Sequence, residues 1–280
     1  MPIFEVKNLK YKYDKLDNSS VNAIDDVSFN IEKGEIVALI GKSGSGKSTL
    51  ISHLNGLIKA DGGSIIFNGQ DIYDKSFNLK KLRFECGIVF QHPEYQLFAD
   101  TVIEDVMFGA IKMGMSKDEA FNKSIETLKM FGIEHLKDEV PFNLSGGEKR
   151  KVAFAGVFVM SPKVLILDEP DAGLDPISKN SFFKLLMDLN AKYNTTILFI
   201  THNLDDVVEY ADKAILLNDG KLVAVDKPIN ILLDEDLMNK SGLCEPYAIS
   251  IYKYLKNKSI ALDKDKLKFN DLKNQILNLW

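Results

Sequence analysis

The sequence predicts an α/β protein whose core is a mainly parallel β-sheet, and three observations support this prediction. Near-continuous apolar runs of strand length suit parallel strands buried on both faces, and they occur at IVALI (36–40), VLIL (164–167) and TILFI (196–200). The residues from about 101 to 160 have the spacing of helices instead. An Asn-Asp-Gly turn at 218–220 separates two further short apolar runs and predicts an antiparallel hairpin.

Composition and charge exclude several classes of protein. The chain has 280 residues, of which 45% are hydrophobic and 27% charged, as in ordinary globular proteins. Its net charge of −5 offers no general basic surface, so we expect no nucleic-acid partner. The opening MPIFEVKNLK lacks a signal-peptide pattern, and no window approaches the ~18 apolar residues that span a bilayer. We therefore expect a soluble, cytosolic protein in which Cys86 and Cys244 are separate, reduced thiols.

The first predicted core strand leads into GKSGSGKST, which matches the phosphate-loop pattern G-x-x-x-x-G-K-[ST]. We expect its three glycines to leave space for backbone N–H groups to reach phosphate oxygens. Lys47 would reach the β- and γ-phosphates, and the Ser48 hydroxyl would hold Mg²⁺. TLISHLNGLI would follow as a helix whose positive end faces the phosphates. The alternative is a glycine-rich turn with a chance lysine, but the pattern favours a nucleotide site made of Gly41, Lys42, Ser43, Gly44, Ser45, Gly46, Lys47, Ser48 and Thr49.

Two short apolar runs, SIIF (64–67) and GIVF (87–90), predict further strands. The second leads into the polar, aromatic stretch FQHPEYQLFAD (90–100), after which the helical spacing begins. Within that region Ser116 and Glu119 form a capping-box pattern at a helix start. We therefore expect a helical subdomain, at about 92–162, inserted into the α/β core.

Polar side chains follow two more of the predicted core strands. VLILDEP ends in Asp168 and Glu169, at the carboxyl end of a strand where ligands of α/β sheets bind. Asp168 would assist Mg²⁺, and Glu169 would polarise an attacking water, unless both acids merely lie in a solvated loop. His202 follows TILFI; a lone histidine is usually structural, but here a neutral imidazole can contact the γ-phosphate and orient Glu169.

LSGGEKRKVAFAG (144–156) is more than a helix start. Ser145 and Glu148 again form a capping box, but a capping box does not require the two glycines between them. Glycines there cost helix stability and leave the N-terminal amides uncovered for an anion. Lys149, Arg150 and Lys151 place three cations where the helix dipole disfavours them. These cations are either solvated or compensated by an external phosphate.

The chain turns polar and helical after Pro228 and ends in KDKLKFNDLKNQILNLW. In this tail one helix face would carry Leu267, Leu272, Ile276 and Trp280. We therefore expect residues 228–280 to form an appendage to the domain.

On these motifs the chain resembles the ATP-binding subunits of ABC transporters over roughly residues 3–227, because LSGG lies between a phosphate loop and VLILDEP. The resemblance implies a P-loop NTPase of ABC ATPase type, with an antiparallel β subdomain, in a domain spanning 1–227. It also implies ATP and Mg²⁺ as cofactors. Two subunits would pack head to tail, so that each ATP contacts one phosphate loop and the other subunit's signature residues, Ser145, Gly146, Gly147 and Glu148. AGLDP (172–176), with Asp175, is similar to the segment that communicates between the two sites.

The same resemblance implies roles for three further positions. Gln91 would contact Mg²⁺ and the attacking water and act together with Glu169 and His202. Tyr13 would stack on adenine, with Tyr11 as a substitute, unless either is ordinary strand packing. The loop after Gln91 would move the helical subdomain, and a groove for a membrane partner would be formed by Pro93, Glu94, Tyr95 and Phe98. The alternative for these aromatics is local packing beneath the loop.

The stretch Q-x-PEYQLF, followed by T-V-x-x-D-V, is similar to the energy-coupling-factor branch of ABC ATPases, which drive uptake of vitamins or metal ions. Within that branch it resembles the second of two paired ATPases. The implied partners are a second, non-identical ATPase, a transmembrane coupling protein and a small substrate-binding membrane protein. The chain would then be peripheral, at the cytoplasmic face of the cell membrane, and attached only through these partners. Its residues 228–280 would hold the two ATPases together or pack on their own domain.

Asp171 departs from the family pattern, since Thr or Ser is common there, and its added negative charge is expected to weaken closure slightly. Two alternative functions remain open. One is a soluble ABC ATPase of DNA repair or translation, although no sustained heptads separate Gln91 from LSGG and there is one phosphate loop. The other is the ATPase of a conventional ABC transporter. A P-loop kinase or GTPase does not account for LSGGEKR.

Overall fold

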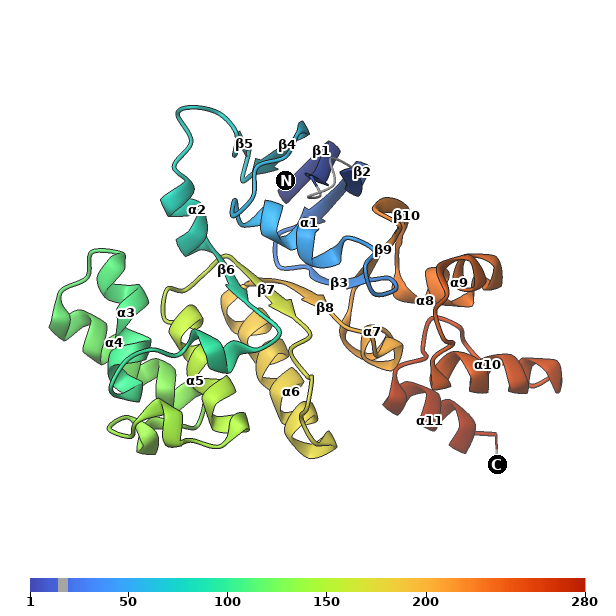
Figure 1. Ribbon diagram of the computed structural model, residues 1–280. Helices are drawn as coiled ribbons and strands as arrows, with labels where there is room; N and C mark the ends of the chain where they lie inside the picture. The colour runs from blue at the N-terminus through green and yellow to red at the C-terminus, as the bar shows by residue number, and fades with distance from the viewer. Residues whose placement is uncertain (15–19, 280) are drawn as a thin grey trace.

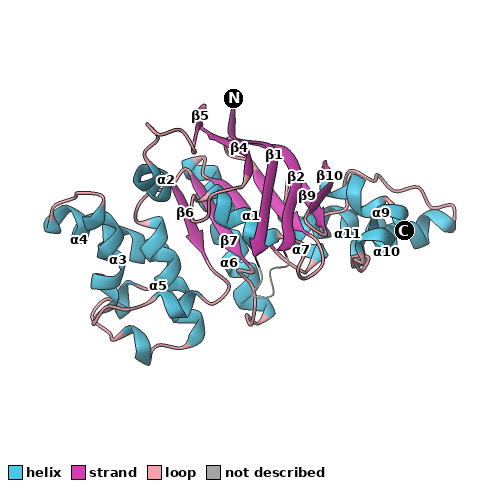
Figure 2. Cartoon of the chain, turned by 45° about the horizontal axis from the view of Figure 1, so that its top comes forward, coloured by secondary structure: helices cyan, strands magenta, loops and turns pink. Residues whose placement is uncertain are grey.

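The computed structural model describes residues 1–14 and 20–279. Two β-sheets occupy the centre of the molecule, with a group of helices around α3, α4 and α5 at one end (Figure 1). A second group, α8 to α11, lies at the opposite end, near the C-terminus (Figures 1 and 2). This arrangement confirms the predicted α/β core with an inserted helical part and a C-terminal helical extension.

The larger sheet contains the predicted core strands. Its spatial order is β10 (Lys221–Asp226), β9 (Lys213–Asn218), β3 (Ile36–Ile40), β8 (Thr196–Ile200), β7 (Val164–Asp168) and β6 (Cys86–Val89). The five strands from β9 to β6 are parallel, and β10 pairs antiparallel with β9 across the predicted hairpin turn. The mainly parallel sheet and the hairpin are both confirmed.

Each central strand is buried on both faces, as its apolar run predicts. In β3, Val37 and Leu39 join the core beneath the smaller sheet, while Ala38 and Ile40 join the core beneath α5, α6 and α7. The strands β7 and β8 divide their side chains in the same alternating way. Because successive side chains point to opposite faces, only a strand covered on both sides can be apolar throughout.

The smaller sheet is antiparallel and covers the first helix. Its order is β2 (Ser20–Glu32), β1 (Pro2–Asp14), β4 (Gly62–Phe67) and β5 (Gln70–Asp71). The helix α1 (Lys47–Leu54) packs against this sheet through Leu50, Ile51 and Leu54. It ends four residues earlier than the predicted helix, because Gly56 adopts a left-handed backbone (φ 68°) just after the last turn.

The helical insertion is built from α3 (Val102–Lys112), α4 (Lys117–Met130) and α5 (Gly146–Phe158). The capping box of Ser116 and Glu119 is present at the start of α4. The 3₁₀ turn η1 (Pro93–Gln96) precedes α3, and two further 3₁₀ turns, η2 (Glu134–Leu136) and η3 (Pro141–Asn143), lie between α4 and α5. The helix α2 (Leu79–Glu85) leads into β6, and α6 (Pro176–Tyr193) and α7 (Leu204–Tyr210) follow β7 and β8.

The C-terminal extension contains α8 (Pro228–Leu233), α9 (Glu235–Ser241), α10 (Tyr247–Asn257) and α11 (Phe269–Leu277). The prediction of one helix face was wrong for Leu267, which lies before α11, while Trp280 lies outside the described residues. Leu267 and Leu272 are nevertheless both buried in the core that includes α7, and Ile276 packs against it. At least part of the extension therefore packs on its own domain.

The two cysteines are free, as expected, with Cys86 buried at the start of β6 and Cys244 exposed. Burial raises the pKa of Cys86 to about 12. No helix within residues 1–14 and 20–279 has the length and apolar character needed to cross a membrane.

Candidate active site

The order of the parallel strands gathers four distant segments at one edge of the sheet. The strands β6, β7, β8 and β3 are neighbours, so their carboxyl ends meet at the same edge. The residues that follow these strands are Gln91, Asp168 with Glu169, His202, and the phosphate loop. These segments were predicted separately from the sequence, and the sheet brings them together.

Glu169 lies at the centre of this edge. The amide Nε2 of Gln91 donates to one carboxylate oxygen at 2.7 Å, and Nε2 of His202 lies 2.8 Å from the other. The backbone of Glu169 is left-handed (φ 47°), which costs a non-glycine residue about 1–3 kcal/mol. Its N–H donates to the carbonyl of Ile200 at 3.1 Å, which helps to hold this conformation. The carboxylate is thus oriented by two side chains and a strained backbone.

Asp168 and the phosphate loop are in direct contact. The Ser48 hydroxyl donates to Oδ2 of Asp168 at 3.2 Å. Burial raises the pKa of Asp168, while the hydrogen bond from Ser48 and the charge of Lys47 lower it. The Lys47 ammonium donates to the carbonyls of Gly41 and Lys42 at 2.7 and 2.9 Å. Burial lowers the pKa of Lys47, and the charges of Glu169 and Asp168 raise it. One cation thus faces both acids.

The three glycines of the loop have different reasons to be glycine. A Cβ on Gly41 would lie 2.2 Å from the carbonyl oxygen of Leu217, and one on Gly46 would lie 2.4 Å from that of Ala23. A Cβ on Gly44 would meet nothing within 4 Å, although its φ of 77° is left-handed. Gly41 and Gly46 thus also allow close packing on the protein backbone, whereas Gly44 faces open space, and the prediction that all three bind phosphates stays a prediction.

The rest of the loop joins neighbouring segments. Ser45 is buried and accepts a backbone hydrogen bond from Gly220, whereas Ser43 is exposed. Lys42 pairs with Asp219 at 2.9 Å, in the turn between β9 and β10. The loop is therefore held against the hairpin, while its central part stays open.

The predicted adenine residue lies beside the phosphate loop. The Tyr13 hydroxyl is 3.4 Å from the Thr49 hydroxyl, and 44% of this residue is exposed. Tyr11 makes edge contacts with Tyr13 at 4.9 Å and with His53 at 4.7 Å between ring centroids, and it is more buried than Tyr13. Tyr13 is therefore more accessible to an adenine ring than Tyr11. No sequence pattern indicated His53, a buried side chain whose Nδ1 is 2.7 Å from the carbonyl of Thr49.

The signature residues are not part of this edge. Ser145 and Glu148 form the predicted capping box at the start of α5, and a Cβ on Gly146 or Gly147 would meet nothing within 4 Å. Figure 1 places α5 in the helical group, away from the loop between β3 and α1. Ser145, Gly147 and Glu148 instead line a cavity of about 530 Å³ together with Leu174 and Ile177. Asp175, in the same segment, caps α6 by accepting from Ile177 and Ser178.

One expectation about charge was wrong. Arg150 is neither solvated nor waiting for a phosphate, because it is buried and donates to the carbonyl of Pro170 at 3.0 Å. Asp171 has a cationic partner that was not predicted, since Lys179 lies 3.4 Å from it and 2.5 Å from Asp206, while the expected effect of Asp171 on closure stays a prediction. Burial raises the pKa of Asp206 to about 6, and Lys179 opposes this increase. The side chains that compensate Asp171 come from α6 and α5, where no motif predicted them.

The loop after Gln91 borders a groove of about 460 Å³. Its walls come from α2, the segment 96–98, α3 and α5, and they include Phe84, Phe98, Phe108, Val157 and Met160. The Phe98 ring contacts Phe108 edge-on at 4.8 Å and 58% of the residue is exposed. Of the four residues predicted for a docking groove, only Phe98 lines this one. Pro93 is buried, and Glu94 and Tyr95 lie outside the groove.

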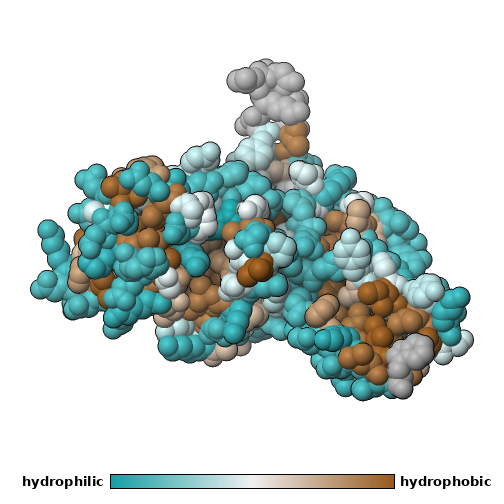
Figure 3. Space-filling model, turned by 90° about the horizontal axis from the view of Figure 1, so that it is seen from below, coloured by the Kyte–Doolittle hydropathy of each residue, from teal (hydrophilic) through white to brown (hydrophobic). Residues whose placement is uncertain are grey.

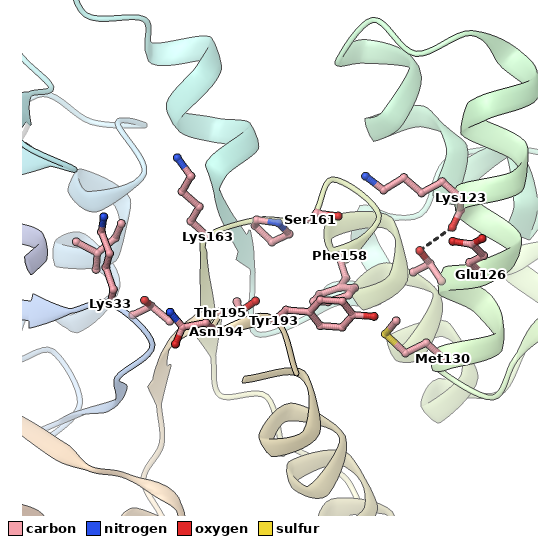
Figure 4. Close-up of a pocket in the computed structure, with 14 residues that line it drawn as sticks. Lys33, Lys123, Glu126, Met130, Phe158, Ser161, Lys163, Tyr193, Asn194 and Thr195 are labelled. Carbon is pink, nitrogen blue, oxygen red and sulfur yellow. Dashed lines mark hydrogen bonds between the residues drawn. The ribbon is translucent and has the colours of Figure 1, made fainter. Parts of the chain in front are cut away.

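A separate pocket of about 500 Å³ lies between α4 and the end of α6 (Figure 4). The aromatic rings of Phe158 and Tyr193 lie side by side within it, flanked by Lys123 and Glu126 on one side and Lys33 on the other. None of the residues predicted for the nucleotide site lines this pocket.

Comparison with known proteins agrees with this geometry. The ABC transporter family profile matches residues 24–172. The chain is 40% identical to the energy-coupling factor transporter ATP-binding protein EcfA2 of Caldanaerobacter subterraneus, over 99% of this chain and 97% of that one. It is 41% identical to EcfA2 of Clostridioides difficile, over 98% and 96% of the two chains.

Two solved structures have the same fold. CbiO1 of Clostridium perfringens, described as part of the ABC transporter complex CbiONQ, superposes with a TM-score of 0.75 at 40% identity, over 85% of this chain and 94% of that one. The ATP-binding cassette MJ0796, in a dimeric post-hydrolysis state with ADP and Pi, superposes with a TM-score of 0.73 at 29% identity, over 80% and 98%. With the phosphate loop, the two acids and the signature helix all in place, the chain belongs to the energy-coupling-factor branch of the ABC transporter family and is an ATP-binding, ATP-hydrolysing subunit.

Proposed function

We propose that Glu169 is the general base of ATP hydrolysis, oriented by His202 and Gln91. The observation that carries this assignment is that both carboxylate oxygens are held, one by a hydrogen bond from Gln91 at 2.7 Å and the other by a contact with Nε2 of His202 at 2.8 Å. A positioned carboxylate that accepts a proton from water typically contributes 10²–10⁴-fold to a rate. His202 also carries an exposed imidazole beside the phosphate loop, where it can contact the γ-phosphate. Lys47 would exchange its two carbonyl contacts for phosphate oxygens.

The residues at this edge fit a magnesium ion bound together with ATP. Mg²⁺ prefers oxygen ligands and is usually held by one or two protein groups plus substrate phosphates. The Ser48 hydroxyl and the Asp168 carboxylate already lie 3.2 Å apart. The Gln91 carboxamide, after the neighbouring strand β6, is hydrogen-bonded to Glu169, the residue that follows Asp168. Within the described residues no group of three or more His, Cys, Asp or Glu side chains is placed to hold a metal alone. The phosphates are thus needed to complete the site, with Mg²⁺ compensating their charge.

The signature residues would serve ATP bound by a second subunit. Gly146 and Gly147 leave the start of α5 uncovered, although they do not face the phosphate loop of their own chain. The amides of a helix start are favourable contacts for phosphate oxygens. The dimeric MJ0796 cassette supports an arrangement in which two such subunits assemble. Tyr13, beside Thr49, would stack on the adenine of the ATP held by its own chain.

The partner ATPase is proposed to be a non-identical paralogue, because the relatives bear the name EcfA2. An apolar surface over the C-terminal helices supports a contact there (Figure 3). In the same C-terminal extension Leu277, Leu279 and Tyr254 are exposed. Large apolar side chains grouped on a surface usually mark a protein contact.

The groove between α2, α3 and α5 is proposed to receive a helix of a transmembrane coupling protein. Its exposed aromatic rings, Phe98 and Phe108, can pack on an apolar helix face. The side-chain oxygen Oε1 of Gln96, a residue that lines this groove, is buried without a hydrogen-bond partner among residues 1–14 and 20–279, and it can accept from a side chain of the docked helix. The assembly would include a small substrate-binding membrane protein, import a vitamin or metal ion, and hold this chain at the cytoplasmic face of the membrane.

Recovery of the assembly from native membranes tests this proposal. The chain would be tagged, extracted with a mild detergent, and purified with whatever accompanies it. We expect a second ATPase carrying LSGG, a polytopic membrane protein and small membrane proteins. Recovery with soluble proteins only would favour a soluble ABC ATPase, and recovery of a single large membrane pair would favour a conventional ABC transporter.

A groove variant makes this test specific. Phe98→Ala with Phe108→Ala removes the exposed rings, so the variant should lose the polytopic protein while it still binds ATP. Phe121→Ala is the matched control, because Phe121 is 42% exposed on α4 but does not line the groove. The docking assignment is wrong if both variants recover the same partners as the wild type.

A further inference from the structure

Arg150 differs from the two lysines that flank it on α5. Lys151 is exposed and Lys149 is half-buried, whereas only 9% of Arg150 is accessible. Its guanidinium crosses from the helical group to the core and donates to the carbonyl oxygen of Pro170. Pro170 directly follows Glu169, so this hydrogen bond ends one residue from the carboxylate that we assign as the base.

The charges of two carboxylates also act on the guanidinium. Burial lowers the pKa of Arg150, and the charges of Glu94 and Asp171 raise it. Glu94 belongs to η1, the turn that follows Gln91, and Asp171 follows Pro170. The helix α5 packs against η1. One buried cation therefore contacts or faces three segments, which are the signature helix, the turn beside the docking groove and the catalytic segment.

The catalytic segment depends on contacts from outside itself. The left-handed backbone of Glu169 persists only if its surroundings hold it there. Two backbone hydrogen bonds do so, from Glu169 N–H to Ile200 and from Ala172 N–H back to the Glu169 carbonyl. The Arg150 side chain supplies a third, at the Pro170 carbonyl. Unlike the other two, this bond comes from the helical group and moves with α5.

We propose that Arg150 is a positioning residue that couples the signature helix to the catalytic carboxylate of the same chain. This inference rests on the proposed roles of Glu169 and Ser145–Glu148. When α5 shifts, because the signature binds the partner's nucleotide or a membrane helix docks, Arg150 transmits the shift to Pro170 and so to the Glu169 carboxylate. The occupancy of one ATP site thereby changes the position of the catalytic base in the other site.

Enzyme kinetics of Arg150→Gln and Arg150→Lys test the proposal, in the membrane assembly and in the isolated chain. A small displacement of a catalytic group can cost about 10²-fold in rate. Arg150→Gln should therefore lower kcat about 10- to 100-fold, change KM for ATP less than about threefold, and lower the Hill coefficient of ATP hydrolysis in the assembly. Arg150→Lys keeps a cationic donor and should recover part of kcat.

Lys213→Gln provides a matched control for lost stability. Lys213 is a half-buried cation that pairs with Glu35 and donates to the carbonyl of Asn30, at the opposite end of its strand from the site. It should lower Tm without changing kcat. The proposal is overturned if Arg150→Gln keeps kcat and the Hill coefficient within twofold of wild type, or if Lys213→Gln reduces kcat equally at a similar loss of Tm. Failure of the base assignment is separate, because it would show as turnover by Glu169→Gln.

Discussion

Replacement of Glu169 by Gln should stop ATP hydrolysis while ATP remains bound. The amide has the shape of the carboxylate, so its oxygen can still accept from Gln91 and its nitrogen can donate to a neutral His202, across the present 2.7 and 2.8 Å contacts. What is lost is the proton acceptor, and the expected decrease in kcat is therefore about 10²–10⁴-fold. The substitution also removes a negative charge that faces Lys47 and the phosphates, so ATP affinity should not decrease.

The assay combines phosphate release at saturating ATP with the identity of the nucleotide that stays bound after gel filtration. The variant should retain unhydrolysed ATP and accumulate closed pairs of subunits, whereas the wild type should retain ADP. Glu209→Gln is the matched control, because Glu209 is a remote carboxylate that accepts from the backbone of Phe269, and an amide can do the same. Turnover above about a tenth of the wild-type value would refute the assignment of Glu169 as the sole base, because a general base contributes at least about 10²-fold.

Two further predictions concern stability. The pKa of Asp206 is about 6 in the folded protein and about 3.9 in an unfolded chain, so this carboxyl costs no stability below about pH 4 and up to about 3 kcal/mol above pH 6. The Tm of Asp206→Asn relative to wild type should therefore increase from pH 4.5 to pH 7.5, and a difference independent of pH would contradict this. Gly46→Ala should lower Tm more than Gly44→Ala, because its Cβ would lie 2.4 Å from the Ala23 carbonyl oxygen, while that of Gly44 meets open space. Equal melting temperatures for the two variants would show that backbone strain alone matters.

The features that the sequence predicted correctly depend on local rules. An apolar run such as 164–167 identifies a doubly buried strand, because side-chain direction alternates residue by residue. The capping boxes at Ser116 and Ser145 also form within one turn of helix, so their spacing alone predicts them. The phosphate-loop pattern belongs to the same class, since eight consecutive residues specify it.

Features that were missed or wrong involve partners far along the chain. Arg150 was expected in solvent because its neighbours are lysines, and no periodicity indicates that its side chain reaches Pro170. Asp171 was judged by its own charge, although Lys179 on the next helix compensates it. The close packing of Gly41 and Gly46 was missed for the same reason, because the carbonyls that they approach lie on other strands.

By itself, the sequence determined the strands, the phosphate loop, the signature helix and the two acids, since each is encoded by residues within a few positions of one another. The tertiary structure decided how these parts meet. The insertion of β8 between β3 and β7 places His202 beside Glu169, and the position of β6 next to β7 brings Gln91 to the same carboxylate across 78 residues of chain. The physical reason is that strand order is set by packing of both sheet faces over the whole domain, and short-range patterns carry no information about it.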